Sequence, residues 1–203
     1  MEIRTIASQT HGRYLVEGDR SDRVVVGFHG YAESAGHCLD QLRLIPGAGE
    51  WTLVAVQALH PFYQSRSGEV VASWMTSQDR ELAIADNVDY IRRIIDSLWK
   101  PATMVFLGFS QGAAMAYRAG ALVAGASGVI ALGGDAPPDV TGGLPPVLIG
   151  RGRSDPWYTP EKLEKDLRFL EGRTEVTVFE FDGAHEWTDE FRSAAGEFLR
   201  SRI

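Results

Sequence analysis

Short, almost continuous hydrophobic runs recur along the chain. They are rich in valine, isoleucine and leucine and do not alternate with polar residues, which is typical of strands covered on both faces. The runs lie at residues 23–28, 51–56, 104–107, 128–132, 147–149 and 176–179, and a shorter edge-strand candidate lies at 12–16. The pattern therefore predicts a buried, mostly parallel sheet.

Between these runs, apolar side chains recur every three or four residues, as they do on one face of an amphipathic helix. The stripes consist of Ile84, Val88, Ile91, Ile95 and Leu98; of Leu163, Leu167 and Leu170; and of Phe191, Ala195 and Phe198. Thr159 followed by Pro160 is a typical helix start, and Thr188 can cap the last helix. Strands that alternate with helices predict an α/β fold. Because no repeat or linker divides the sequence, we expect one domain spanning residues 1–203.

The charge balance narrows the classes of partner. The chain has 20 basic and 27 acidic residues, a net charge of −7, so it has no evident footprint for nucleic acid and no stable association with an anionic membrane is expected. Its one cysteine, Cys38, cannot form an internal disulfide, which fits a reducing compartment. We therefore expect a cytoplasmic protein. The sequence leaves a homodimer open.

One pentapeptide carries a specific chemical signal. Residues Gly108-Phe109-Ser110-Gln111-Gly112 match G-x-S-x-G directly after a hydrophobic run and before a helix rich in small residues. This pattern is typical of a nucleophile elbow, in which a tight strand-to-helix turn exposes a serine hydroxyl at the start of a helix. Helix amides there favour developing negative charge. The sequence predicts Ser110 as a nucleophile.

A serine nucleophile needs a base and an acid that orients the base. His185 is the only histidine after Ser110, and it follows the last hydrophobic run. Asp155 follows the run at 147–149 and is the favoured acid, with Asp135, after the preceding run, as the second candidate. Asp182 is close to His185 in sequence and is expected to organise that loop.

The same chemistry requires backbone amides that stabilise an oxyanion. The amide of Gln111, which follows the serine, is one expected donor, and the amide of Tyr31, in the loop after the run at 23–28, is the other. We expect His29 to be a buried packing residue. No metal site is expected, because His185-Glu186 begins like the H-E-x-x-H motif but Asp189 stands at its fifth position.

With these motifs in place, the chain resembles the carboxylesterase/phospholipase family of small α/β-hydrolases, which includes acyl-protein thioesterases. The resemblance rests on residues 27–31, 56–58, the Trp74 segment, 107–112, 152–155 and 183–185. It implies Ser110, Asp155 and His185 as the catalytic triad and the amides of Tyr31 and Gln111 as the oxyanion hole. It also implies a minimal α/β-hydrolase fold, a mostly parallel central sheet flanked by helices, without a large cap domain.

Aromatic residues in predicted strand-end loops are candidates for the substrate pocket: Tyr63, Trp74, Phe109 and Trp157. We expect a serine carboxylesterase that hydrolyses short- to medium-chain esters or thioesters of small molecules and needs no metal or organic cofactor. The sequence leaves three further functions open: a (lyso)phospholipase, a lactone hydrolase of the dienelactone type, and a non-catalytic α/β-hydrolase that acts as a binding protein.

Overall fold

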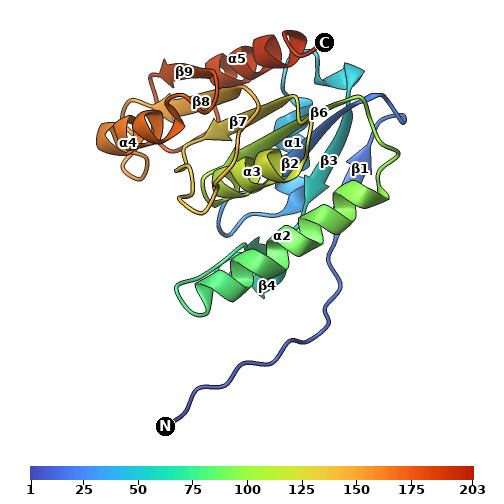
Figure 1. The fold of residues 1–203 in the computed structure, drawn as a ribbon, viewed down its shortest axis with the longest axis vertical. Helices are drawn as coiled ribbons and strands as arrows, with labels where there is room; N and C mark the ends of the chain where they lie inside the picture. Colours follow the sequence, from blue (N-terminus) through green and yellow to red (C-terminus); the bar gives the residue numbers. More distant parts are fainter.

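A seven-stranded sheet forms the centre of the molecule. The computed structural model describes residues 1–203, and the strand order is β1-β3-β2-β6-β7-β8-β9. The strands are β1 (Tyr14–Glu17), β2 (Arg23–Phe28), β3 (Thr52–Val56), β6 (Thr103–Phe109), β7 (Gly128–Leu132), β8 (Val147–Gly152) and β9 (Val176–Phe181). Only the edge strand β1 runs antiparallel to its neighbour; all other pairs are parallel. The predicted sheet is confirmed (Figure 1).

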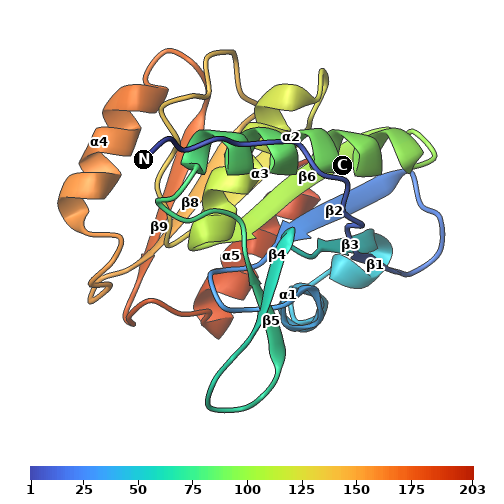
Figure 2. The same cartoon turned by 90° about the horizontal axis from the view of Figure 1, so that it is seen from below.

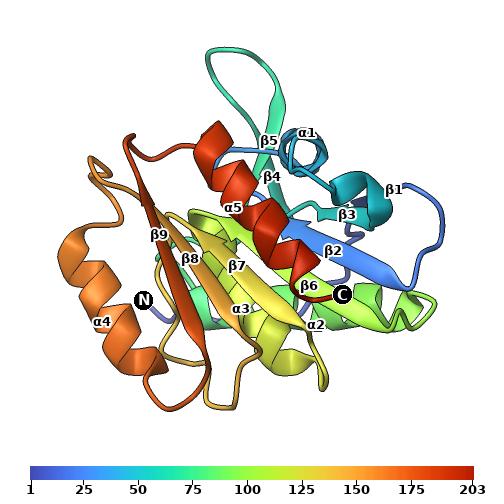
Figure 3. The ribbon, with the colours of Figure 1, turned by 90° about the horizontal axis from the view of Figure 1, so that it is seen from above.

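Helices cover both faces of this sheet. They are α1 (Ala35–Arg43), α2 (Arg80–Ser97), α3 (Gln111–Leu122), α4 (Pro160–Leu170) and α5 (Asp189–Arg200), with a short 3₁₀ turn at Ala48–Glu50. Figure 2 shows α2, α3 and α4 on one face, and Figure 3 shows α1 and α5 on the other. The molecule is therefore a three-layer α/β sandwich, which is the predicted fold class.

The central strands are buried on both faces, and this explains why they lack polar alternation. In β2, Val24 and Val26 face the core beneath α2, α3 and α4, whereas Val25 faces the core beneath α1 and α5. All three side chains are fully buried. Each apolar residue of such a strand loses its contact with water whichever face it points to, so the hydrophobic effect favours continuous apolar runs.

Two features were not predicted from the hydrophobic pattern. Helix α1 begins after Ser34, whose hydroxyl accepts a hydrogen bond from the amide of His37, and it buries Cys38 and Leu42. A two-stranded hairpin, β4 (His60–Tyr63) and β5 (Val70–Ser73), extends away from the main sheet (Figure 3). All residues of β4 are exposed, whereas Val71, Ala72 and Ser73 of β5 are buried, so neither strand shows the alternation that would reveal a hairpin.

The parallel arrangement brings several loops to one edge of the sheet. Strands β2, β6, β7, β8 and β9 all point the same way, so the segments that follow them meet at their carboxyl ends. Ligands of open α/β sheets bind at this edge. None of the helices has the length and apolar character that crossing a bilayer would demand.

Candidate active site

Ser110 lies between β6 and α3 in a strained conformation. Its φ of 53° and ψ of −119° place it in a region that non-glycine residues rarely adopt. The turn lifts the serine side chain above the edge of the sheet at the N-terminus of α3. The backbone of Ser110 is held by hydrogen bonds from its amide to the carbonyl of Leu132 and from the amide of Ala113 to its own carbonyl. This is the elbow geometry that the pentapeptide predicts.

Both glycines of the pentapeptide are required by close backbone packing. A Cβ atom on Gly108 would lie 2.1 Å from the carbonyl oxygen of Gly112. A Cβ atom on Gly112 would lie 2.2 Å from the carbonyl oxygen of Phe28. These contacts are with backbone atoms, which cannot move aside like a flexible side chain. The two glycines therefore let α3 pack directly against the ends of β2 and β6.

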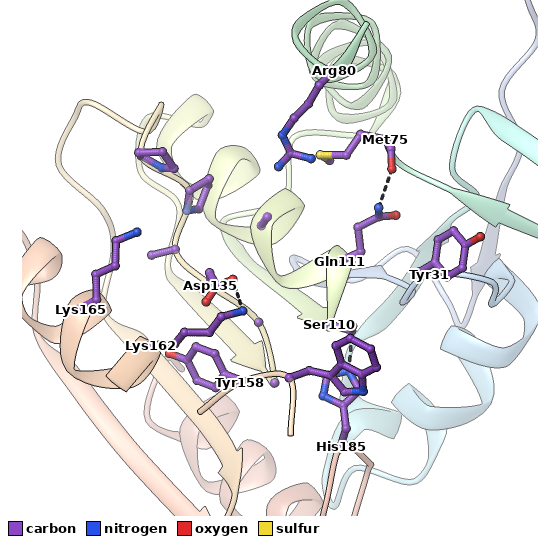
Figure 4. Close-up of a pocket in the computed structure, with 17 residues that line it drawn as sticks. Tyr31, Met75, Arg80, Ser110, Gln111, Asp135, Tyr158, Lys162, Lys165 and His185 are labelled. Atoms are coloured by element: carbon purple, nitrogen blue, oxygen red, sulfur yellow. Dashed lines mark hydrogen bonds and ion pairs between the residues drawn. The ribbon is translucent and has the colours of Figure 1, made fainter. Parts of the chain in front are cut away.

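Ser110, His185 and Asp155 form a continuous series of hydrogen bonds, although they come from three separate loops. Ser110 Oγ lies 2.8 Å from Nε2 of His185, and Nδ1 of His185 lies 2.8 Å from Oδ2 of Asp155 (Figure 4 shows the first of these contacts). A carboxylate can only accept, so Nδ1 carries the donated proton and Nε2 is left to accept from the serine hydroxyl. This is the protonation pattern required of a base.

The two oxygens of Asp155 have different partners. While Oδ2 faces His185, Oδ1 accepts hydrogen bonds from the amides of Trp157 and Tyr158 at 2.7 and 2.9 Å. The side chain is almost completely buried, so these donors replace its lost hydration. The carboxylate is fixed in position before any substrate arrives.

The other two aspartates lie elsewhere. Asp135 is exposed and pairs with the ammonium of Lys162 at 3.1 Å, and it makes no contact with His185. Asp182 is exposed and pairs with Arg153. Of the two acids that the sequence left open, Asp155 is therefore the one within hydrogen-bond distance of the histidine.

Two backbone amides near Ser110 have no partner in the protein. Neither the amide of Tyr31 nor that of Gln111 donates a hydrogen bond to another group of the chain. Both residues line the cavity that contains Ser110 and His185. The pair is available to a negatively charged oxygen.

His29 holds the loop that carries Tyr31. Its Nδ1 donates to the carbonyl of Gly30 at 2.7 Å, and its Nε2 accepts from the amide of Ala58 at 3.1 Å. Burial lowers the pKa of His29 to about 4, so the ring is neutral and keeps this one tautomer. The expectation that His29 is a buried packing residue is confirmed.

The side chain of Gln111 has a role that the sequence did not reveal. Its Oε1 accepts from the amide of Trp74 at 2.8 Å, and its Nε2 donates to the carbonyl of Met75 at 2.7 Å. These bonds attach the segment after β5 to the first residue of α3. Glutamine has an acceptor and a donor on one planar group, and both are used here.

Of the four candidate pocket residues, only Trp157 lines the cavity. Trp157 is 69% exposed and lines the cavity. Phe109 is buried and packs on the ring of His185, with 4.8 Å between the ring centroids, so it supports the histidine from behind.

Trp74 and Tyr63, like Phe109, do not line the cavity. Trp74 is fully buried: its indole donates to the carbonyl of His29 and its ring packs against Phe28, which makes it part of the core. Tyr63 lies on the projecting hairpin strand β4 and is 76% exposed, outside the cavity lining.

The cavity itself has a volume of about 670 Å³, a size typical of small-molecule sites. Its wall includes three cationic residues that were not among the predicted site residues, Arg80, Lys162 and Lys165. The spacing of the two lysines, three residues apart in a helix that follows β8, was the available signal, since residues at this spacing share one helix face. No group of three or more His, Cys, Asp or Glu side chains is arranged to hold a metal ion.

Comparisons with known proteins agree on the architecture. No protein-family model and no curated protein sequence matches the chain. Among solved structures, it is similar to esterase PE8 with 20% identity and a TM-score of 0.75, over 96% of this chain and 100% of the other. It is also similar to a phospholipase/carboxylesterase from Dyadobacter fermentans, with 20% identity, a TM-score of 0.74 and coverage of 96% and 99%.

A third similar structure is acyl-protein thioesterase 2 from Zea mays, with 15% identity, a TM-score of 0.74 and coverage of 95% and 99%. At such low identity, these similarities bear on architecture alone. Since almost the whole of each chain is matched and the strand order is that of a helix-flanked, mostly parallel sheet, the chain has the α/β-hydrolase fold of these esterase and thioesterase structures.

Proposed function

We propose that the protein is a serine hydrolase of carboxylic esters or thioesters, with Ser110 as nucleophile, His185 as base and Asp155 as the orienting acid. The observation that carries the proposal is the series of two 2.8 Å contacts from Ser110 through His185 to Asp155 at the edge of the sheet. The names of the similar structures, esterases and a thioesterase, support the same reaction class.

In the first half of the reaction, Oγ of Ser110 attacks the acyl carbon while Nε2 of His185 takes its proton. The carboxylate of Asp155 stabilises the imidazolium that forms, and the free amides of Tyr31 and Gln111 donate to the oxyanion. The bond from the acyl carbon to the alcohol oxygen or thiol sulfur then breaks, and the leaving group takes the proton from His185. An acyl-serine remains.

The second half repeats these roles with water. His185 takes a proton from water as the water oxygen attacks the acyl carbon, and the bond to Ser110 Oγ breaks. The serine recovers its proton from His185, and the carboxylic acid leaves. Every bond and proton is accounted for with the residues in the site and one water molecule.

The substrates proposed are small esters with short to medium acyl chains. A cavity of about 670 Å³ can hold an ester of this size. The only strands outside the main sheet are β4 and β5 of the projecting hairpin. A panel of p-nitrophenyl esters should show falling kcat/KM as the acyl chain lengthens beyond medium length. A rise through long chains, with activation at lipid interfaces, would favour a phospholipase instead.

A lactone hydrolase and a binding protein both fit the site less well. A lactone hydrolase of the dienelactone type would use a cysteine, but Cys38 is buried on α1 and burial raises the pKa of its thiol far above the ordinary value. A binding protein would not need the serine–histidine–aspartate series. The single cysteine supports a cytoplasmic location, which we propose together with the activity.

Labelling with a fluorophosphonate tests the nucleophile directly. The wild-type protein should acquire one phosphonyl adduct, located by mass spectrometry on the peptide that contains Ser110, and Ser110→Ala should acquire none. Ser154→Ala, which removes an exposed hydroxyl from the loop after β8, is the matched control and should label like the wild type. A folded wild-type protein that does not label, or equal labelling of the Ser110→Ala variant, would show that the proposal is wrong.

A further inference from the structure

The charges around the cavity differ in sign from those of the molecule as a whole. The chain has a net charge of −7, yet the residues that line the cavity include the three cations Arg80, Lys162 and Lys165 and only one carboxylate, Asp135. The overall acidic composition therefore conceals a local surplus of positive charge beside Ser110.

These cations come from two helices that are far apart in sequence. Arg80 is the first residue of α2, and Lys162 and Lys165 lie on α4. Figure 4 shows Arg80 and Lys165 reaching from different sides of the cavity towards the space between them. Positive charge therefore stands on two walls of the same cavity, where either cation can meet an anionic group of a bound substrate.

Arg80 and Lys165 act on the carboxylates of Asp139 and Asp166 only through space, without direct contact. Neither forms an ion pair, whereas Lys162 is paired with Asp135 at 3.1 Å. The nearby carboxylates are occupied by other donors. Asp139 accepts two hydrogen bonds from Arg118, and Asp166 is buried, where it accepts from the amide of Ala136 and the hydroxyl of Tyr158.

The rest of the cavity wall can contact the part of a substrate that adjoins the bond to be cleaved. Tyr31 and Trp157 are both well exposed, and both line the cavity together with Ser110 and His185. They provide apolar surface beside the nucleophile, and the cations add charge to the same wall. The lining thus combines a reacting centre, apolar walls and free positive charge in one cavity.

We propose that this cavity selects esters that carry a free carboxylate, with Arg80 and Lys165 as the residues that bind that group. The inference rests on the proposed esterase function and specifies its substrate class. Lys162 can contribute as well where the substrate carboxylate competes with Asp135 for its ammonium.

The test uses two pairs of esters that differ only in charge. Mono-p-nitrophenyl adipate and its methyl ester place the charge on the acyl side, and 4-acetoxyphenylacetate and its methyl ester place it on the alcohol side. The measured quantity is the ratio of kcat/KM for the anionic ester to that for its neutral partner, after subtraction of spontaneous hydrolysis. We expect this ratio to exceed one in at least one pair, and the pair identifies the side.

Variants then assign the preference to the two residues. Arg80→Gln and Lys165→Gln should each lower the ratio by about 2- to 5-fold, as expected for single partly exposed ion pairs. Arg92→Gln, an exposed and unpaired arginine further along α2, changes the net charge equally and should leave the ratio unaltered. Added NaCl should also reduce the ratio, through KM rather than kcat, because salt screens exposed charges.

The results separate this inference from the proposed function. Turnover of the neutral esters with no preference for either anionic ester, or a preference that both variants retain, would overturn the carboxylate site and leave the esterase standing. If none of the four esters is hydrolysed, the esterase function is overturned and the carboxylate site with it.

Discussion

The backbone amide of Tyr158 donates a hydrogen bond of 2.9 Å to Oδ1 of Asp155, the oxygen that does not face His185. The amide of Trp157 donates to the same oxygen. Because two amides require an acceptor at this position, the side chain of residue 155 cannot rotate without leaving both amides unpaired. The contact thus determines which atom of residue 155 meets the histidine.

Asp155→Asn should therefore lower kcat by orders of magnitude, up to about 10⁴-fold, with little change in the fold. The asparagine oxygen would remain with the two amides, so its NH₂ group would point at Nδ1 of His185. The histidine would then carry its proton on Nε2 and could not accept from Ser110. The measurement is kcat on a neutral p-nitrophenyl ester, with circular dichroism to check folding.

Asp135→Asn is the comparison for that variant. It removes an exposed carboxylate that contacts Lys162 and not His185, so kcat should fall far less. If the Asp135 variant were inactive and the Asp155 variant retained most of its activity, the assignment of the acid would be wrong.

Gln111→Ala should destabilise the protein by about 1–3 kcal/mol while keeping the backbone amide of residue 111. The variant leaves the buried amide of Trp74 without its acceptor and removes one of two donors to the carbonyl of Met75, which keeps its hydrogen bond from the hydroxyl of Ser73; a buried donor left without a partner costs this amount. Urea unfolding measures the stability. Gln78→Ala, in the exposed part of the same segment, is the control and should have little effect.

Asp166 should make the protein less stable as pH rises. Burial raises the pKa of Asp166 to about 6 from 3.8, so the folded state binds a proton that the unfolded state has already lost between these values. Its favourable contribution is complete below about pH 4 and is lost as pH rises through 6, a change of about 3 kcal/mol. Relative to the wild type, Asp166→Asn should therefore gain stability between pH 4 and 7.5.

The free energy of unfolding in urea at several pH values measures this difference. Asp182→Asn, which removes an exposed carboxylate, is the control. A stability difference between wild type and Asp166→Asn that stays constant from pH 4 to 7.5 would contradict the prediction.

His29 should act in the opposite direction. Burial lowers the pKa of His29 to about 4 from 6.5. Between these two pH values the imidazole is protonated in the unfolded chain but not in the folded chain. Stability is present above pH 6.5 and falls by about 3 kcal/mol as pH drops through 4. His29→Gln is expected to be less stable than the wild type at pH 7, with a gap that narrows as pH falls.

Unfolding curves at pH 7, 5.5 and 4.5 follow that gap. His11→Gln removes an exposed imidazole from the N-terminal segment and serves as the control. A gap that is as wide at pH 4.5 as at pH 7 would count against the assignment of a neutral, buried imidazole to His29.

Features that depend on neighbouring residues could be predicted from the amino-acid sequence. Continuous apolar runs indicate strands buried on both faces, because both sides of each strand lose water. The pentapeptide around Ser110 indicates a tight turn, because only glycine allows backbone atoms to approach within the distances seen at Gly108 and Gly112. The same local patterns place Ser110, Asp155 and His185 each after a strand, and their order along the chain is the one that α/β-hydrolases use.

Features that depend on which segments meet required the folded structure. Asp135 and Asp155 both follow apolar runs, and the positions of the loops after β7 and β8 bring one of them to Lys162 and the other to His185. Trp74 was predicted to line a pocket, but its place beneath the loop of His29 makes it part of the core. Arg80 and Lys165 border one cavity because α2 and α4 lie on the same face of the sheet. Their positions in the sequence, 85 residues apart, do not specify how close the two side chains lie, because strand pairing and helix packing decide that distance.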